Sequence, residues 1–354
     1  RCIMQKTRLN YKFIHMSTRQ KMVLVSIFIF YFCTGLIYSR KIGILKDILK
    51  PFMMRVDQNT IYISDQYFVF YYSKDDLKII KKIGGKGGGP GFFLMEPSIK
   101  IYNRKILLYL PFHFAFFSKS GELISEKRIA KSFFNLDYVN GNYVMSLLNF
   151  AQGSGKYHLE NFTIFDSDFK EIKTFHSKKT SAGRLNKKVK RFLIEPLNKF
   201  QCYNGKLYFV NGKKGFHIEV LNSQGTLLNV IHRDYEKIKI PEPYKKRKLE
   251  EHRNIPIVKK RWHSLNKLFE YTFPEYFPPI QNFRITDDKI YIKTYRSLKQ
   301  KIEYIVLDLT GKFLGKFFLP DIKERLYDIN GNAFYFLKED EIEEDWELHV
   351  VNLH

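Results

Sequence analysis

A polar turn followed by a short apolar strand recurs along this chain, and this repeat constrains the fold more than any other feature. Asn-Gly and Asp-rich pairs in the turns supply the residues with positive φ that tight hairpins require. The six copies occupy residues 59–63, 103–107, 140–144, 204–208, 287–291 and 330–334. Six recurrences of the same signal indicate one hairpin-bearing unit repeated along the chain.

A second landmark follows each of the first five copies: a strand end, a polar turn and another strand. It lies at residues 72–77, 117–123, 165–169, 221–227 and 307–313. The segments between landmarks are short, alternating and rich in Ile, Val, Phe and Tyr, which is typical of β-strands. Each unit therefore contains four strands in a meander.

Four-stranded units of about 40–45 residues are the blades of β-propellers. We predict an all-β fold: a six-bladed β-propeller of four-stranded antiparallel blades, with a short α-helical insertion between blades 4 and 5. Residues 40–354 form this single propeller, and residues 234–278 are the insertion. The blades are expected at about 50–84, 96–130, 132–177, 198–233, 279–320 and 322–354. Because the last blade ends after its third strand, we expect residues 41–45 to supply its outer strand and close the ring.

The N-terminal segment has the pattern of an export signal. Met16 is the preferred start, and basic residues then precede the uncharged run 22–39, as in a secretory signal peptide. We expect residues 1–39 to be a leader, cleaved after Gly35 or Ser39, and the protein to be periplasmic, at the cell surface or secreted. The run is also long enough to cross a bilayer as an uncleaved anchor, and that alternative stays open.

The three cysteines bear on the same question. Cys2 and Cys33 would be lost with the leader, and the aromatic residues before Cys33 do not form a lipobox. Cys202 would remain alone, so no internal disulfide is expected. We interpret Cys202 as a buried strand residue, since no His or acid pattern marks it as a nucleophile.

The most distinctive stretch is glycine-rich and runs from Ile83 to Phe93. It resembles the G-x-G-x-GPGEF…P…I linker of NHL-type six-bladed β-propellers, in particular exported bacterial six-bladed propeller proteins of largely unassigned function. It departs from that pattern at Phe92, where the family usually has Glu. The resemblance implies a binding scaffold, with only some relatives being enzymes, and a structural inter-blade motif at Gly84, Gly87, Gly89, Pro90, Gly91, Phe93 and Pro97.

A phosphate-cradling loop is the rival interpretation of these glycines. Phosphate motifs of this kind require a helix to begin after the last glycine. Here Pro90 interrupts the glycine-rich run, and the sequence that continues through Phe92, Phe93 and Pro97 is typical of a strand. A tight crossover between blades is therefore favoured.

Basic residues concentrate where the repeat is broken. The chain has 60 Lys+Arg against 36 Asp+Glu, a net charge of +24, and its 44% hydrophobic share excludes wholesale disorder. One basic stretch is Lys178–Arg191, between blades 3 and 4. The insertion holds another, with helical composition at 245–253 and helix-like apolar spacing at 257–269. We expect its apolar face to dock on the propeller through Trp262, Leu265 and Phe269.

These stretches predict an anion-binding face at one end of the disc. Its partner would be a protein or an anionic glycan or lipid; the alternative is a solvated surface in a Lys-rich, AT-rich genome. Nucleic acid is not expected, because export argues against it and no recognition helix or zinc motif occurs. The candidate binding residues are Lys187, Lys188, Lys190, Arg191, Lys245, Lys246, Arg247, Lys248, Lys259, Lys260 and Arg261.

No motif indicates catalysis, and we predict no catalytic residue, metal or cofactor. Neither a zinc-type His pair nor a G-x-S-x-G elbow occurs. The acidic pairs at 166–168 and 287–288 suit turns better than calcium. Four histidines lie on or beside predicted strands: His113, His158, His217 and His349. Some could line the central channel, but a strand histidine is more often packed or solvent-facing.

The leading hypothesis is an exported, non-catalytic binding or scaffold propeller that engages its partner through one disc face. One alternative is a channel-centred hydrolase or lyase, possibly calcium-dependent. Another is a membrane-tethered sensor domain, which requires an uncleaved leader. A propeller fold by itself does not set a function.

Overall fold

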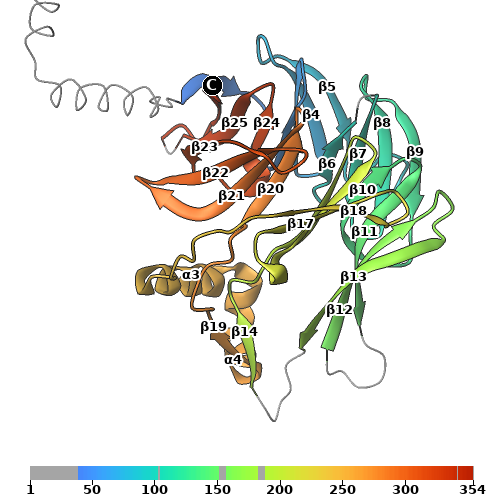
Figure 1. Cartoon of the computed structure of the whole chain (residues 1–354). Coiled ribbons are helices and arrows are strands. Elements are labelled where there is room, and N and C mark those ends of the chain that lie inside the picture. Colours follow the sequence, from blue (N-terminus) through green and yellow to red (C-terminus); the bar gives the residue numbers. More distant parts are fainter. Residues whose placement is uncertain (1–38, 103, 151–156, 182–187, 341, 354) are drawn as a thin grey trace, which may run out of the picture. The chain divides into compact units, whose positions relative to one another are not determined.

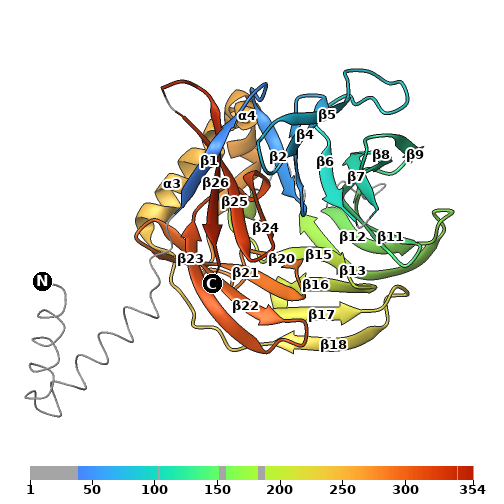
Figure 2. The same cartoon turned by 90° about the horizontal axis from the view of Figure 1, so that it is seen from above.

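The computed structural model describes residues 39–102, 104–150, 157–181, 188–340 and 342–353. From Lys41 onward the chain forms one compact unit, in which six four-stranded antiparallel sheets are arranged as the blades of a ring (Figures 1 and 2). The predicted six-bladed β-propeller is therefore confirmed. The predicted leader lies outside the described residues, except for Ser39.

The blades follow one another along the chain, each with its strands in sequence order except the last. Blade 1 contains β2 (Pro51–Val56), β3 (Thr60–Asp65), β4 (Phe68–Ser73) and β5 (Ile79–Gly84); blade 2 contains β6 (Ser98–Ile101), β7 (Lys105–Leu110), β8 (His113–Ser118) and β9 (Leu123–Arg128). Blade 3 contains β10 (Phe133–Val139), β11 (Asn142–Phe150), β12 (Tyr157–Phe165) and β13 (Glu171–Ser181); blade 4 contains β15 (Asn198–Tyr203), β16 (Lys206–Asn211), β17 (His217–Leu221) and β18 (Leu227–His232). Blade 5 contains β20 (Asn282–Thr286), β21 (Lys289–Leu298), β22 (Lys301–Asp308) and β23 (Phe313–Pro320); blade 6 contains β24 (Tyr327–Asn330), β25 (Ala333–Glu339), β26 (Trp346–Asn352) and β1 (Arg40–Leu45).

The middle strands of each blade carry the packing between blades. β7 and β8 have the sequences KILLYL and HFAFFS, nearly continuous apolar runs, because both of their faces are covered by neighbouring blades. The outer strand β9, LISEKR, exposes most of its side chains. Hydrophobic clusters therefore lie between adjacent blades, as between blades 2 and 3 and between blades 4 and 5.

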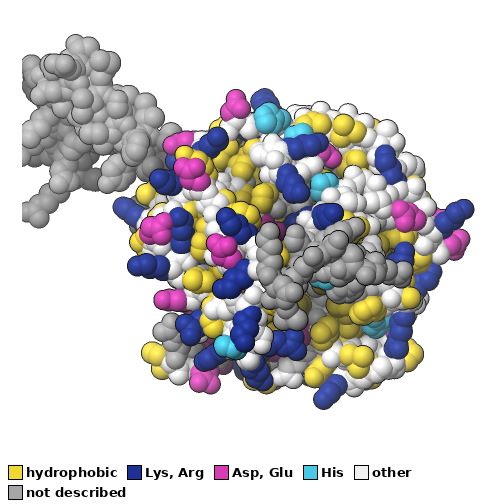
Figure 3. Space-filling model, turned by 90° about the horizontal axis from the view of Figure 1, so that it is seen from below, with side chains coloured by type: hydrophobic (Ala, Val, Ile, Leu, Met, Phe, Trp, Pro, Cys, Tyr) yellow, Lys and Arg dark blue, Asp and Glu magenta, His cyan; other side chains and the backbone are white. Residues whose placement is uncertain are grey.

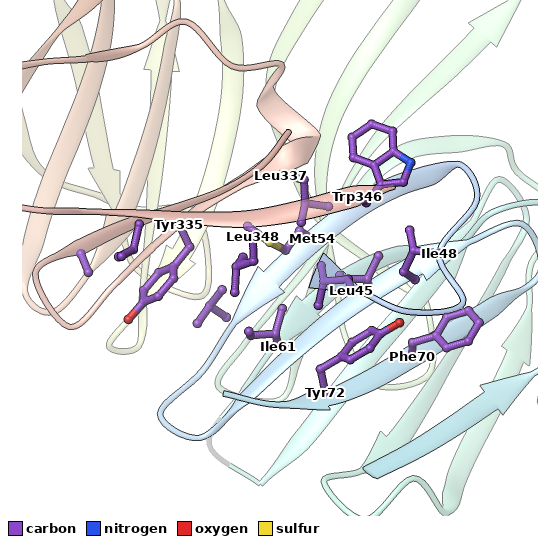
Figure 4. Packing of buried hydrophobic residues seen from close by; sticks show 14 residues of the cluster. Leu45, Ile48, Met54, Ile61, Phe70, Tyr72, Tyr335, Leu337, Trp346 and Leu348 are labelled. Carbon is purple, nitrogen blue, oxygen red and sulfur yellow. The ribbon is translucent and has the colours of Figure 1, made fainter. Parts of the chain in front are cut away.

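The ring closes between the first and last strands of the propeller. β1 lies beside β26 as the outer strand of blade 6, so the expected closure is confirmed. Lys41 on β1 forms an ion pair with Glu347 on β26, and Trp346 donates from Nε1 to the Leu49 carbonyl at 3.3 Å. Figure 4 shows Leu45 and the neighbouring Ile48 packed into the cluster that joins blade 6 to blade 1.

The insertion contains two helices and one strand. α3 (Glu242–Asn254) and α4 (Pro256–Leu268) follow β18 and precede β20. Pro256 occupies the first turn of α4, where its missing N–H has no intrahelical role. β19 (Phe269–Thr272) pairs in parallel with β14 (Val189–Phe192), which joins blades 3 and 4. In the described part of the chain, neither helix is long and apolar enough to cross a membrane.

Two predicted boundaries are wrong. β13 extends to Ser181, so residues 178–181 belong to blade 3 and not to the basic linker. The predicted helical face does not include Phe269, because the helix ends at Leu268 and Phe269 begins β19. In both places strand pairing with a distant partner decides the element, and local composition does not show that partner.

Two short 3₁₀ turns complete the fold. η1 (Gly212–Lys214) lies between β16 and β17, and η2 (Glu324–Leu326) leads into β24, the inner strand of blade 6.

Candidate functional site

The two predicted basic stretches lie at the same end of the ring. In a four-stranded meander every connection from one blade to the next leaves from the same end. The segment that contains β14 and the insertion that contains α3, α4 and β19 are two such connections, and Figure 1 shows them together below the blades. We call this end the insertion face. Figure 3 views the ring from this side and shows Lys and Arg side chains spread across it.

Pairing of β14 with β19 joins the two basic stretches directly. Lys190 is opposite Glu270 and Arg191 is opposite Tyr271 in this parallel pair. The Arg191 guanidinium lies over the Phe269 ring, 5.0 Å from its centroid. Lys188, Lys190 and Arg191 are exposed, whereas the candidate Lys187 lies outside the described residues.

The cations of α3 are largely neutralised by acids on the same helix. Lys245 Nζ lies 2.6 Å from Glu242, and Glu251 is 3.7 Å from Arg247 and 3.1 Å from Lys248. These i,i+3 and i,i+4 pairs are neighbours on the helix surface. The hydrogen bond and charge of Lys245 lower the pKa of Glu242. Of the predicted candidates on α3, Lys246 is exposed and belongs to none of these pairs.

The cations of α4 cannot form such pairs within their own helix, because α4 contains no acidic residue. Lys259, Lys260 and Arg261 are exposed, and among the described residues no salt bridge involves any of them. Lys260 shares its face with His263 and Lys267, which follow at i+3 and i+7 and are also exposed. His263 and Lys267 are not among the predicted candidates, although their helical spacing from Lys260 is visible in the sequence.

The insertion docks on the propeller through aromatic residues other than those predicted. Tyr244 of α3 packs edge-on against Phe277 at 4.9 Å between ring centroids, and Phe277 stacks on Tyr295 of blade 5 at 4.6 Å. Trp262 instead stacks on Tyr271 of β19, at 5.4 Å and 8° between ring planes. The stacking partner of Trp262 therefore belongs to the insertion itself, whereas the predicted partner was the propeller.

The glycine-rich stretch forms the connection from β5 to β6. Gly84 has a φ of +90°, and a Cβ there would lie 2.6 Å from the Tyr67 carbonyl oxygen. Phe93 is fully buried and contacts Phe117 of blade 2. Phe92, at the position where the resembled family usually has Glu, lies directly beside Gly85.

Several backbone N–H groups of this loop donate to acceptors within the protein. Gly85 donates to Tyr67 O at 3.0 Å, Gly87 to Phe93 O at 3.1 Å and Phe93 to Gly85 O at 2.8 Å. Gly91 donates to the Glu126 carboxylate at 2.6 Å. A phosphate cradle needs such N–H groups to point at the ligand, so these bonds favour the crossover role. Gly89 accepts from Phe92 N–H at 3.1 Å, and the motif ends at the buried Pro97; Pro90 lies in the same turn.

The acidic turns serve the backbone and link neighbouring blades. Asp166 accepts from the N–H groups of Asp168 and Lys170, both at 2.9 Å. Asp287 accepts from Gly331 N–H at 2.9 Å, which ties blade 5 to blade 6. Among the described residues, no group of three or more His, Cys, Asp or Glu could hold a metal ion.

The strand histidines do not line the centre of the ring. His113 lies on β8, His158 on β12, His217 on β17 and His349 on β26, and the innermost strand of each blade contains no His in its described residues. His113 lies 3.0 Å from Glu126, and burial lowers the pKa of its imidazole despite that carboxylate. These positions favour the interpretation of the four histidines as packed or solvent-facing strand residues over a role in the channel.

Cys202 lies on the inner strand β15 of blade 4. Its backbone N–H donates to Asp137 at 2.9 Å. Burial, followed by the charge of Asp137, raises the pKa of the Cys202 thiol well above its usual range. A cysteine is nucleophilic as the thiolate, so this environment suits a structural residue.

Comparisons with known proteins leave the family open. No family model matches the chain, and no curated protein matches it. Among solved structures, BamB from Moraxella catarrhalis aligns over 84% of this chain and 71% of its own, with 7% identity and a TM-score of 0.31. The WD40 domain of Neurospora crassa Pan2 aligns over 85% and 88%, with 8% identity and a TM-score of 0.39. A Bacteroides caccae protein of unknown function aligns over 79% and 82%, with 10% identity and a TM-score of 0.36. At these similarities the propeller assignment rests on the six sheets of the chain itself.

Proposed function

We propose that this chain is an exported, non-catalytic binding or scaffold propeller, of the NHL-like kind that its glycine-rich linker resembles. Propellers commonly bind partners through the loops at one end of the ring. Here the insertion face carries the two longest departures from the blade repeat and most of the predicted candidate cations. The proposed partner is an acidic protein, an anionic glycan or an anionic lipid surface.

The observation that carries this proposal is the contrast between the two helices of the insertion. On α3 three cations already have carboxylate partners, whereas Lys259, Lys260 and Arg261 on α4 have none in the described structure. An unpaired, exposed cation retains its full attraction for an external anion, and neighbouring cations of one sign add to the local field. The binding surface is therefore centred on α4.

The test compares two variants that each remove three positive charges. K259Q/K260Q/R261Q alters α4, and K245Q/R247Q/K248Q is the matched control on α3. The probes are phosphatidylglycerol vesicles, heparin and poly-glutamate, each with a neutral counterpart (phosphatidylcholine vesicles, dextran and poly-glutamine). The purified full chain should bind at least one anionic probe, and the binding should weaken as salt rises.

The α4 variant should bind that probe about ten- to hundredfold more weakly, since each exposed charge contributes about 0.5–1 kcal/mol. The α3 variant should lose much less, because its cations are already paired. Equal losses in the two variants would show that total charge, and not α4, determines binding. Unchanged binding in the α4 variant would contradict the proposal outright.

Export is a separate part of the proposal and rests on the sequence of residues 16–39. N-terminal sequencing of the protein isolated from its native cells tests it. A mature terminus at Leu36 or Arg40 would support a cleaved leader, which corresponds to cleavage after Gly35 or Ser39. An intact N-terminus in the membrane fraction would support the anchored alternative, and an intact one in the cytosol would refute export.

A further inference from the structure

Cationic side chains from four different blades meet at the innermost strands of the ring. Figure 2 shows these inner strands surrounding the ring axis. The cations lie on inner strands of blades 1, 2, 4 and 5: Arg55 on β2, Lys100 on β6, Lys199 on β15 and Arg284 on β20. They are far apart in sequence and do not belong to either basic stretch of the insertion face.

Three of these four cations have a carboxylate partner. Lys100 Nζ lies 2.6 Å from Asp137 of blade 3. Lys199 is paired with Glu324 of η2, and Arg284 Nη2 with Asp328 of β24. The first pair joins blades 2 and 3, the second joins blade 4 to the turn that precedes blade 6, and the third joins blades 5 and 6. The pairs therefore hold the inner strands together.

Arg55 is the fourth cation, and in the described structure it has no ion pair. Its one hydrogen bond there runs from Nη1 to the carbonyl of the preceding residue, Met54, at 2.6 Å. The carboxylates whose charges act on Arg55 are Asp328 and Glu324, and Glu324 is paired with Lys199. The Asp328 carboxylate already accepts from Val56 N–H at 2.8 Å and Ile329 N–H at 2.7 Å, as well as from Arg284.

Arg284 also has an unused donor on the same inner strands. Its Nε–H is buried and has no hydrogen-bond partner, although Nη2 is paired. A buried donor without a partner is costly. The charge of Arg284 is the second cause, after burial, that lowers the pKa of Arg55. The strands that carry Arg55 and Arg284 both contact Asp328 of β24, through Val56 N–H and through Arg284 Nη2. The four cations of the inner strands are paired with three carboxylates, so this network has one positive charge more than its carboxylates neutralise.

We infer that Arg55 and Arg284 together bind a small carboxylate ligand at the ring axis. One carboxylate carries the single negative charge that this network lacks. Its two coplanar oxygens match the fork of a guanidinium and can accept from Arg55 and from Arg284 Nε–H at once. The Arg284 side chain is 25% exposed, so solvent and a small solute can reach it. This site is independent of the insertion face and of the proposed function.

Thermal unfolding of the full chain in sodium acetate and sodium propionate, against sodium chloride of equal ionic strength, tests this site. A ligand that binds only the folded state raises Tm, by about 2–5 °C when its concentration is a hundred times its Kd. Wild type should show this rise with a carboxylate. The variant R55M should lose the rise, whereas K316Q, a change at an exposed Lys on the outer strand β23 of blade 5, should retain it.

The same variant separates ligand binding from a structural role for Arg55. If the guanidinium is an uncompensated charge held for a ligand, R55M in chloride should melt at or above the wild-type temperature. A lower Tm in chloride together with no response of wild type to either carboxylate would overturn the proposal and make Arg55 structural. A Tm rise with inorganic phosphate but not with acetate or propionate would overturn the carboxylate assignment.

A direct measurement keeps the proposal testable if R55M does not fold. In wild type, the Nε–H resonance of Arg284 should shift in a saturable way as acetate is added and should not shift with chloride. An Arg284 signal that does not respond to acetate would refute the site. Binding of the polyanion probes should be unaffected by R55M, so failure of this site and failure of the α4 surface are distinguishable.

Discussion

Lys41 and Glu347 are 306 residues apart in the sequence and form an ion pair at the seam of the ring. The pair joins β1 to β26, so the first strand of the propeller completes its last blade. His349 adds a contact at 2.7 Å to the same carboxylate. Because Lys41 is about half exposed, the ion pair by itself contributes little to stability. The buried residues beside it provide most of the stabilisation of the closed ring.

Leu45 and Leu49 form a matched pair for measuring this closure. Leu45 is 1% exposed within the cluster between blades 6 and 1, whereas Leu49, four residues later, is 72% exposed. Leu45→Ala should lower the free energy of unfolding by about 2–5 kcal/mol, and Leu49→Ala by less than about 0.5 kcal/mol. Urea denaturation of both variants checks this. Similar small losses would show that β1 does not help to hold the ring closed.

Gly84 and Gly141 separate backbone strain from steric clash. Their φ values are nearly equal, +90° and +89°. A Cβ at Gly84 would lie 2.6 Å from the Tyr67 carbonyl oxygen, whereas a Cβ at Gly141 has nothing within 4 Å. Gly141→Ala should therefore lower the free energy of unfolding only by the strain of a positive φ, about 1–2 kcal/mol. Gly84→Ala should cost about 1–3 kcal/mol more. Equal losses in chemical denaturation would remove the packing argument for the glycine-rich crossover.

Glu324 should make the fold sensitive to acid. Partial burial favours its neutral form, but the charge and hydrogen bond of Lys199 outweigh this effect and hold the pKa of Glu324 at about 2. A carboxyl whose pKa is lower in the folded chain stabilises it fully above the unfolded value of 4.5, and that contribution is lost as pH falls towards 2. The Glu324 side chain is 54% exposed, so solvent screening limits its contribution to below about 1 kcal/mol.

Melting curves of wild type and Glu324→Gln between pH 2.5 and 6 test this sign. Wild type should be the more stable protein at pH 6, and the difference should shrink as the pH is lowered. A difference that is constant with pH would indicate that Glu324 acts through packing or a neutral hydrogen bond.

The blades were predictable because their determinants are local. Turns such as Asn140-Gly141 and Asn204-Gly205 require positive φ, and the apolar runs beside them are strands whichever blade they meet. Strand length was less predictable: β13 continues to Ser181 because it pairs with β12 over that whole length. For this reason the predicted basic linker begins at Lys178, although the strand continues to Ser181.

The binding residues were predictable only in part. Composition made the cations of α3 and α4 equal candidates for anion binding, but Glu242 and Glu251 pair with those of α3. The i,i+3 and i,i+4 spacing of these pairs was visible in the sequence. The docking of Tyr244 through Phe277 on Tyr295 was not, because its last partner lies in another blade.

The sequence by itself determined the number of blades, their four-strand pattern and the position of the insertion, since turn chemistry and strand alternation act between near neighbours. Only the tertiary structure decided which charges are paired and which are not. Arg55 and Arg284 come from blades 1 and 5, and their shared position on the inner strands follows from closing the ring. Electrostatic interactions depend on distance in space, and for these residues that distance is unrelated to separation along the chain.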